Sequence, residues 1–210
     1  MTSTRRALVV IDVQQEYFDG PLQIQFPPPE TSLTNVIRAI DVAVAADLPV
    51  VVVRHEGPAE SPVFGRGSTG AQLHPQITEK VLPTWKESTK QVASVLADTS
   101  VVDWLREQGV GTITLVGYMT NNCVIGSAAA AEPLGFAVEV LSDATGAINI
   151  ANGAGTVPAE QVHRTLMALL HSNFAAVATT AAWTEAVQQD EALESSNLVR
   201  SAVDGLASAG

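Results

Sequence analysis

The chain has 210 residues, of which 46% are hydrophobic and 16% are charged, and its formal net charge at pH 7 is −11. This length and composition exclude a disordered chain and favour one large domain with a substantial core. The acidic balance argues against sequence-independent binding to nucleic acid or to an anionic membrane. No apolar run reaches the length of a membrane span, no signal-peptide pattern is present, and one cysteine cannot form an internal disulfide. We therefore expect a soluble, cytoplasmic protein.

Strand and helix patterns alternate along the chain. The continuous apolar or β-branched runs typical of buried strands cover residues 7–11, 49–54, 112–116, 136–141 and 174–178, with a weaker run over 88–92. Helical patterns cover 31–46, 99–108, 124–134, 159–172 and 180–186, and the first three have candidate caps at Thr31 or Ser32, Thr99 or Ser100, and Thr120 or Asn121. This alternation predicts an α/β, three-layer Rossmann-like fold with a central, mostly parallel six-stranded sheet and helices on both faces.

The last 23 residues differ in composition from the rest of the chain. Charge and serine content rise from residue 188, which predicts a domain over 1–187 and a tail over 188–210. Residues 190–206 have the pattern of an amphipathic helix, and two interpretations of it stay open, a helix docked on a neighbouring subunit and a frayed end. Residues 57–74 and 145–158 are expected to be long loops, and the first is expected to close over a site.

Polar side chains follow several of the expected strands. Asp12 follows the first strand, His55 and Glu56 end the second, and Cys123 follows the strand over 112–116. The carboxyl ends of parallel strands meet at one edge of a sheet, where ligands bind in open α/β folds. Asp12 taken alone equally fits a solvated turn or a helix cap.

Cys123 is the only cysteine, and it lies between a strand and an alanine-rich helix. In the first turn of a helix capped by Thr120 or Asn121, free N–H groups and the helix dipole would favour a thiolate. Most lone cysteines are nevertheless buried core residues. Cys123 is therefore a candidate nucleophile that needs partners from elsewhere in the chain.

Three motifs together resemble the isochorismatase-like cysteine hydrolases. They are Val-Ile-Asp-Val-Gln followed by phenylalanine at 10–18, Gly-x-x-Thr-Asn-x-Cys-Val at 117–124, and Ser-Asp-Ala at 142–144. The resemblance covers roughly residues 7–183, and the family includes nicotinamidases, N-carbamoylsarcosine amidohydrolase, streptothricin hydrolase and isochorismatase itself. It implies an aspartate–lysine–cysteine triad, in which Asp12 matches the general base and Cys123 the nucleophile. It also implies a cis peptide bond between Tyr118 and Met119.

The lysine of the triad is less obvious from the sequence. Lys90 fits the family spacing to a serine four residues later, Ser94, and to Thr99 beyond it. Lys86 has no serine at that offset and is kept as the alternative. The resemblance therefore implies Lys90 as the residue that stabilises the Cys123 thiolate.

The resemblance also implies a reaction, an amidohydrolase cleavage of a small molecule at a C–N bond through a thioester. The backbone N–H groups of Met119 and Cys123 would hold the oxyanion. Two alternatives stay open, an isochorismatase-type hydrolase of a vinyl ether, which needs no thiol, and a non-catalytic binding relative. Relatives are usually oligomers, so a homo-oligomer, dimer or tetramer, is expected with a small-molecule substrate and with no nucleic acid or membrane partner.

The remaining site residues are expected around this triad. The side chains expected to contact substrate are those of Phe18, His55, Tyr118 and Asn122. No cofactor and no metal is expected, because residues 53–58 lack the Asp-x-His pair that nicotinamidases carry there, and His55, Glu56 and His74 match no compact ligand spacing. His163 and His171 are expected to be structural or exposed.

Overall fold

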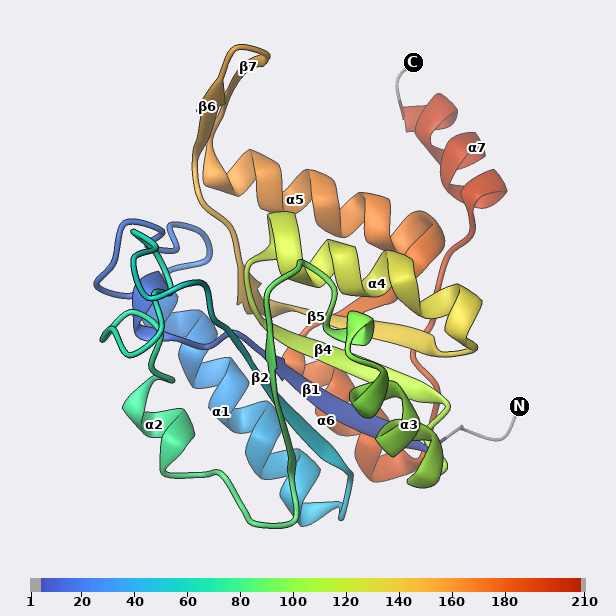
Figure 1. The fold of residues 1–210 in the computed structure, drawn as a ribbon. Coiled ribbons are helices and arrows are strands. Elements are labelled where there is room, and N and C mark those ends of the chain that lie inside the picture. The colour runs from blue at the N-terminus through green and yellow to red at the C-terminus, as the bar shows by residue number, and fades with distance from the viewer. Residues whose placement is uncertain (1–4, 209–210) are drawn as a thin grey trace.

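The computed structural model describes residues 5–208, and its centre is a six-stranded sheet (Figure 1). Every neighbouring pair in this sheet is parallel, and the strands follow the order β3-β2-β1-β4-β5-β8. The strands are β1 (Arg6–Ile11), β2 (Val50–His55), β3 (Lys86–Lys90), β4 (Thr112–Tyr118), β5 (Ala137–Gly146) and β8 (Ala176–Ala178). The expected α/β fold with a parallel sheet is confirmed.

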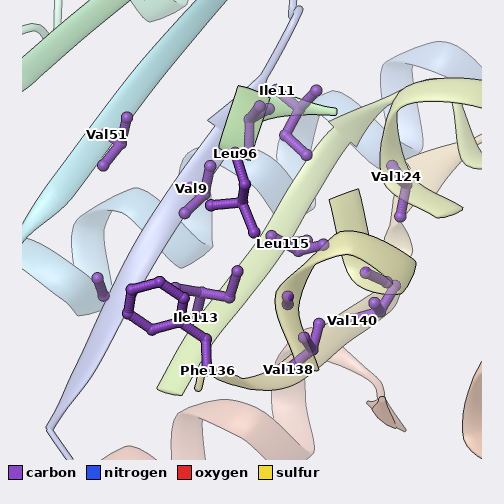
Figure 2. Packing of buried hydrophobic residues seen from close by; sticks show 14 of the residues in the cluster. Val9, Ile11, Val51, Leu96, Ile113, Leu115, Val124, Phe136, Val138 and Val140 are labelled. Atoms are coloured by element: carbon purple, nitrogen blue, oxygen red, sulfur yellow. The ribbon is translucent and has the colours of Figure 1, made fainter. Parts of the chain in front are cut away.

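Helices cover both faces of this sheet (Figure 1). The helices α1 (Pro29–Ala45) and α6 (Thr180–Gln189) lie on one face, and α3 (Thr99–Glu107), α4 (Ile125–Ala131) and α5 (Ala159–Leu169) lie on the other, while the short α2 (Pro75–Thr78) lies at the side. Alternate residues of β1 serve the two faces, because side chains of a strand alternate in direction. Val9 and Ile11 belong to the cluster that includes buried residues of α3 and α4, and Leu96 and Leu115 lie near them (Figure 2). Leu8 and Val10 belong to the cluster that includes buried residues of α1. No helix in the described part of the chain is long and apolar enough to cross a membrane.

Several element boundaries differ from those expected. The helix α1 begins at Pro29, since proline fits the first helical position, and neither Thr31 nor Ser32 caps it. The N-cap of α3 is Asp98 rather than Thr99 or Ser100, because the Asp98 carboxylate accepts a hydrogen bond from the Ser100 N–H. The strand β3 covers 86–90 rather than 88–92.

The segment expected to be a loop over 145–158 contains further strand structure. The strand β5 continues to Gly146, and β6 (Ile150–Asn152) and β7 (Gly155–Val157) form an antiparallel hairpin that projects away from the sheet (Figure 1). The helix α7 (Leu198–Ser208) ends the described chain and projects beyond the end of α5, where it contacts the Leu170–Phe174 turn (Figure 1). The expected helix over 190–206 is therefore present, although it begins eight residues later.

The strand order changes direction between β1 and β4. From β1 the chain adds β2 and β3 on one side, and then crosses over to add β4, β5 and β8 on the other side. The carboxyl ends of β1 and β4, where Ile11 is paired with Gly117, therefore flank a topological switch point. This is where open α/β sheets bind ligands.

Gly117 permits the close approach of β4 to β1 at this point. Its φ is +100°, in the region that favours glycine, and a Cβ atom added there would lie 2.0 Å from the carbonyl oxygen of Ile11. A glycine is therefore required where the two strands that lead to the site meet.

We predict that Gly117→Ala lowers the free energy of unfolding by about 2–5 kcal/mol, because overpacking adds about 1–3 kcal/mol to a left-handed backbone cost of about 1–2 kcal/mol. Gly109→Ala is the matched control, since Gly109 has a φ of +68° but has open space where its Cβ would lie. Gly109→Ala should therefore lower the free energy of unfolding only by the backbone cost of about 1–2 kcal/mol. Equal losses in urea unfolding of the two variants would contradict this account.

Candidate active site

Three side chains that are far apart in the sequence meet at the switch point. The Nζ atom of Lys90 lies 2.6 Å from Oδ2 of Asp12 and 3.2 Å from Sγ of Cys123. Asp12 is 0% exposed, Cys123 1% and Lys90 4%, so the cluster is withdrawn from water. A carboxylate, an ammonium and a thiol in contact can move a proton and generate a nucleophile.

The backbone around Asp12 aims its side chain into this cluster. Asp12 is the first residue after β1, it has a φ of +49°, and its N–H donates to the carbonyl of Val53 on β2. The left-handed conformation is uncommon outside glycine, although aspartate tolerates it better than most residues. Strain of this kind is found where the surroundings impose a functional geometry.

The strand β3 decides between the two candidate lysines. Lys90 ends β3 opposite His55 at the carboxyl edge of the sheet, whereas Lys86 begins β3 opposite Val51. Four residues of strand separate the two positions by about 13 Å. The structure therefore brings Lys90, and not Lys86, to Asp12 and Cys123.

Cys123 lies in a π-helical turn, Thr120–Val124, that leads directly into α4. Turns of this type occur frequently at functional sites. No side chain caps it, so the expected caps at Thr120 and Asn121 are wrong. The Ser127 hydroxyl donates to the Cys123 carbonyl at 2.6 Å and accepts from the Val95 N–H at 3.0 Å. This hydroxyl ties the cysteine turn to the segment that follows Lys90.

The electrostatics of Cys123 differ from the sequence prediction. Burial, with the Asp12 carboxylate as the next cause, raises the pKa of Cys123 to about 12, although Lys90 opposes this shift. Burial also raises the pKa of Asp12, against the opposing effect of Lys90. The net shift of the Cys123 pKa is therefore opposite in direction to the one expected for a thiol at a helix terminus. Instead, a neutral thiol faces a carboxyl group that binds protons more tightly than an exposed one.

The residues expected to contact substrate are placed unevenly around the cluster. His55 is half-buried beside Lys90. Met119, whose backbone N–H is expected to hold the oxyanion, immediately precedes the cysteine turn. Tyr118 is buried, and its hydroxyl is bonded to the Ser32 hydroxyl at 2.7 Å, which fixes it against α1. Asn122 is exposed, so the structure does not bring its side chain into the buried cluster. The peptide bond between Tyr118 and Met119 is cis, as the resemblance implies.

Aromatic side chains cover the cluster. Phe64, from the 57–74 segment, packs its ring 5.2 Å from that of His55 and 5.3 Å from that of Tyr17, measured between centroids. Phe18 packs edge-on against Tyr118 at 5.7 Å. The 57–74 segment therefore contacts the site through the packing of Phe64 on His55.

His163 is buried and structural, which fits the expectation, but its particular role in holding the cysteine turn was not predicted. Its Nε2 lies 3.0 Å from the Ser142 carbonyl and must donate to it, so its Nδ1 accepts from the Thr120 hydroxyl, also at 3.0 Å. Burial lowers the pKa of His163, which is consistent with a neutral ring. Helical spacing from Ala159 and Val162 to Leu170 places position 163 on the buried face of α5, a signal that the sequence already contained.

We predict that Thr120→Val and His163→Phe each lower the free energy of unfolding by about 1–3 kcal/mol, because each leaves a buried polar partner unsatisfied. The double variant should lower the free energy of unfolding by clearly less than the sum of the two single losses. The second substitution removes the polar partner that the first one left unsatisfied. Urea unfolding measures all three, and Thr165→Val at an exposed position of α5 is the control. Strict additivity would show that the bond does not couple α5 to the turn.

Comparison with known proteins agrees with this geometry. The isochorismatase domain model matches residues 6–182. A solved structure of a candidate isochorismatase from Burkholderia xenovorans LB400 is 43% identical, with 98% of each chain covered and a TM-score of 0.94. A secreted isochorismatase effector of Verticillium dahliae is 36% identical over 66% of this chain and 71% of its own, and nicotinamidase 3 of Arabidopsis thaliana is 28% identical over 68% and 74%. The chain therefore belongs to the isochorismatase family.

Proposed function

We propose that this hydrolase cleaves a C–N bond of a small, amide-like substrate through a thioester at Cys123. The observation that carries the proposal is the contact of the Lys90 ammonium with both the Asp12 carboxylate, at 2.6 Å, and the Cys123 sulfur, at 3.2 Å. Hydrolysis of a vinyl ether needs an acid but no thiol, so a buried cysteine held in this contact favours acyl transfer.

The chemistry follows from the protonation states of the cluster. Asp12 accepts the thiol proton as the Cys123 sulfur attacks the substrate carbonyl, and the Lys90 ammonium stabilises the sulfur while it carries negative charge. The backbone N–H groups of Met119 and Cys123 are assigned to the oxyanion, where each donor contributes about 3 kcal/mol to the transition state. Asp12 then returns the proton to the leaving nitrogen, and a thioester remains.

The second half of the reaction restores the enzyme. Asp12 takes a proton from water, the resulting hydroxide attacks the thioester, and the Cys123 sulfur leaves as a thiolate that is reprotonated by Asp12. The raised pKa of Asp12 suits both proton transfers, because a general base works best when its pKa approaches the working pH. The overall change consumes one water and yields an acid and an amine or ammonia.

The cluster is closed, so substrate needs a path to Cys123. His55 and Met119 are the half-buried residues beside the cluster, and Phe64 lies over His55. We assign substrate entry to a displacement of the 57–74 segment that moves Phe64 away from His55. Closure of such a segment over bound substrate would exclude water from the thioester-forming step.

We predict that the wild-type chain releases ammonia from at least one member of a panel of small primary amides and N-carbamoyl compounds, and that Cys123→Ala abolishes this release. Acid-quenched intact-protein mass spectrometry should show the substrate acyl group attached to the wild-type chain. In Asp12→Asn the same acyl group should accumulate more slowly. Cys123→Ser is the matched control, because it keeps size and position but has a poorer nucleophile. Inert amides together with cleavage of isochorismate would instead favour the vinyl-ether reaction.

The sequence expectation of a homo-oligomer remains a proposal, and two projecting elements support it. The hairpin β6–β7 is an isolated two-stranded sheet, which is marginally stable alone, and residues 144–159 contain no charged side chain. On α7, Val199, Val203 and Leu206 share one face and are 74%, 59% and 80% exposed. We propose that the 188–210 tail packs on a second copy through this face, whereas the proposed domain over 1–187 contains the site.

We predict that Leu206→Glu shifts the protein toward monomer in size-exclusion chromatography with light scattering, because it buries a charge in the proposed contact. Val44→Glu is the control, since Val44 is also exposed, at 46%, but lies on α1. A wild-type chain that is monomeric at micromolar concentration would contradict the proposal.

The cytoplasmic location likewise stays a prediction, and the name of one relative describes a secreted protein.

A further inference from the structure

Lys90 has a third contact that the triad does not use. Its Nζ atom lies 3.3 Å from Nδ1 of His55, in addition to its contacts with Asp12 and Cys123. An ammonium has three N–H donors and no acceptor. The structure therefore places three acceptor groups, a carboxylate, a sulfur and an imidazole nitrogen, within contact distance of this ammonium.

The three acceptors surround the ammonium as ligands surround a metal ion. One ligand atom from each of Asp12, His55 and Cys123 lies within 4.8 Å of the other two. Separations of this size fit acceptors placed along the three N–H directions of one nitrogen about 3 Å from each of them. In this structure the cation among these three residues is the ammonium of Lys90.

Contacts of both its backbone and its ring hold His55 in place. The Gln14 side-chain amide donates to the carbonyl of His55 and accepts from its N–H, both at 2.8 Å, so a single side chain fixes both backbone groups. His55 and Lys90 are paired across β2 and β3, and the ring of Phe64 packs against the imidazole. None of these contacts depends on a bound substrate.

We propose that His55 is a positioning residue for the Lys90 ammonium rather than a substrate contact. Its Nδ1 lone pair accepts a hydrogen bond from the third N–H of this ammonium. This role rests on the proposed function, because a fixed Lys90 ammonium stays between the Asp12 carboxylate and the Cys123 sulfur during proton transfer. It requires a neutral ring with its proton on Nε2. The charged or titratable groups that face this ring are Lys90, Asp12 and Cys123, while the adjacent Glu56 is paired with Arg66 at 2.8 Å.

The protonation of His55 agrees with this role. Burial, followed by the nearby Lys90 charge, lowers the pKa of His55. An imidazolium at this position would face the ammonium as a like charge and would offer it no acceptor. A neutral His55 is therefore compatible with a charged Lys90 over the neutral range of pH.

The test compares two substitutions of similar size. In His55→Asn, the amide oxygen replaces Nδ1 as an acceptor, whereas His55→Leu fills the same space with no acceptor. We expect His55→Leu to lower kcat by about 10–100-fold, the range for residues that orient a ligand, with a smaller effect on KM, and His55→Asn to restore most of it. A raised KM with unchanged kcat in both variants, or no change in either, would overturn the proposal.

A second measurement is independent of any substrate and of the proposed function. Nitrogen-15 NMR of the histidine rings near neutral pH should show His55 with an unprotonated Nδ1, and Lys90→Met should shift that resonance. The signal that disappears in His55→Asn assigns the His55 ring and separates it from that of His163, whose Nδ1 is also an acceptor. A protonated Nδ1 in the wild-type chain would overturn the His55 proposal, whereas failure of the amide panel with the expected NMR result would overturn only the proposed function.

Discussion

The site depends on one buried ion pair, that between Lys90 and Asp12. Transferring a carboxylate and an ammonium out of water is expensive, and such a pair persists only when close geometry and further hydrogen bonds compensate for the lost hydration. Here the ammonium meets a carboxylate at 2.6 Å, a sulfur at 3.2 Å and an imidazole nitrogen at 3.3 Å. Removing either charge would leave the other buried and unpaired, so the same contact supports both the local fold and the chemistry.

The parallel sheet provides the positions that this contact needs. Asp12 and Cys123 follow β1 and β4, the two strands on either side of the switch point, and Lys90 reaches them from the end of β3. Gly117 lets β4 approach β1 closely, and the Thr120–His163 bond anchors the cysteine turn to α5. The geometry of the cluster is thus set by backbone elements that are themselves packed into the core.

Much of the fold and of the cluster was predictable from the sequence. Apolar runs gave the strands of the sheet, and polar residues after those runs indicated the correct edge. Lys90 was favoured over Lys86 by family spacing alone, and β3 explains that preference, since only its last residue reaches the site. The turn between β6 and β7 is Gly153–Ala154, since Asn152 pairs with Gly155, and the glycine and asparagine content of this segment was an available turn signal.

Other features depend on packing that a linear sequence does not reveal. Asp98 displaced the neighbouring candidates as the cap of α3, because adjacent polar residues compete and only backbone placement decides among them. The high pKa of Cys123 follows first from burial and then from the neighbouring Asp12 carboxylate, and both depend on the tertiary packing. The bond between His163 and Thr120 joins residues 43 positions apart, so no local pattern could specify it.

The most direct test of the account is a pH titration of the Cys123 thiolate, followed by its ultraviolet absorbance, in the wild-type chain and in Lys90→Met. Because Lys90 opposes the upward shift caused by burial and by Asp12, the pKa of Cys123 should be higher in Lys90→Met than in the wild-type chain. A midpoint that is unchanged when the ammonium is removed would contradict the claim that Lys90 stabilises the nucleophile.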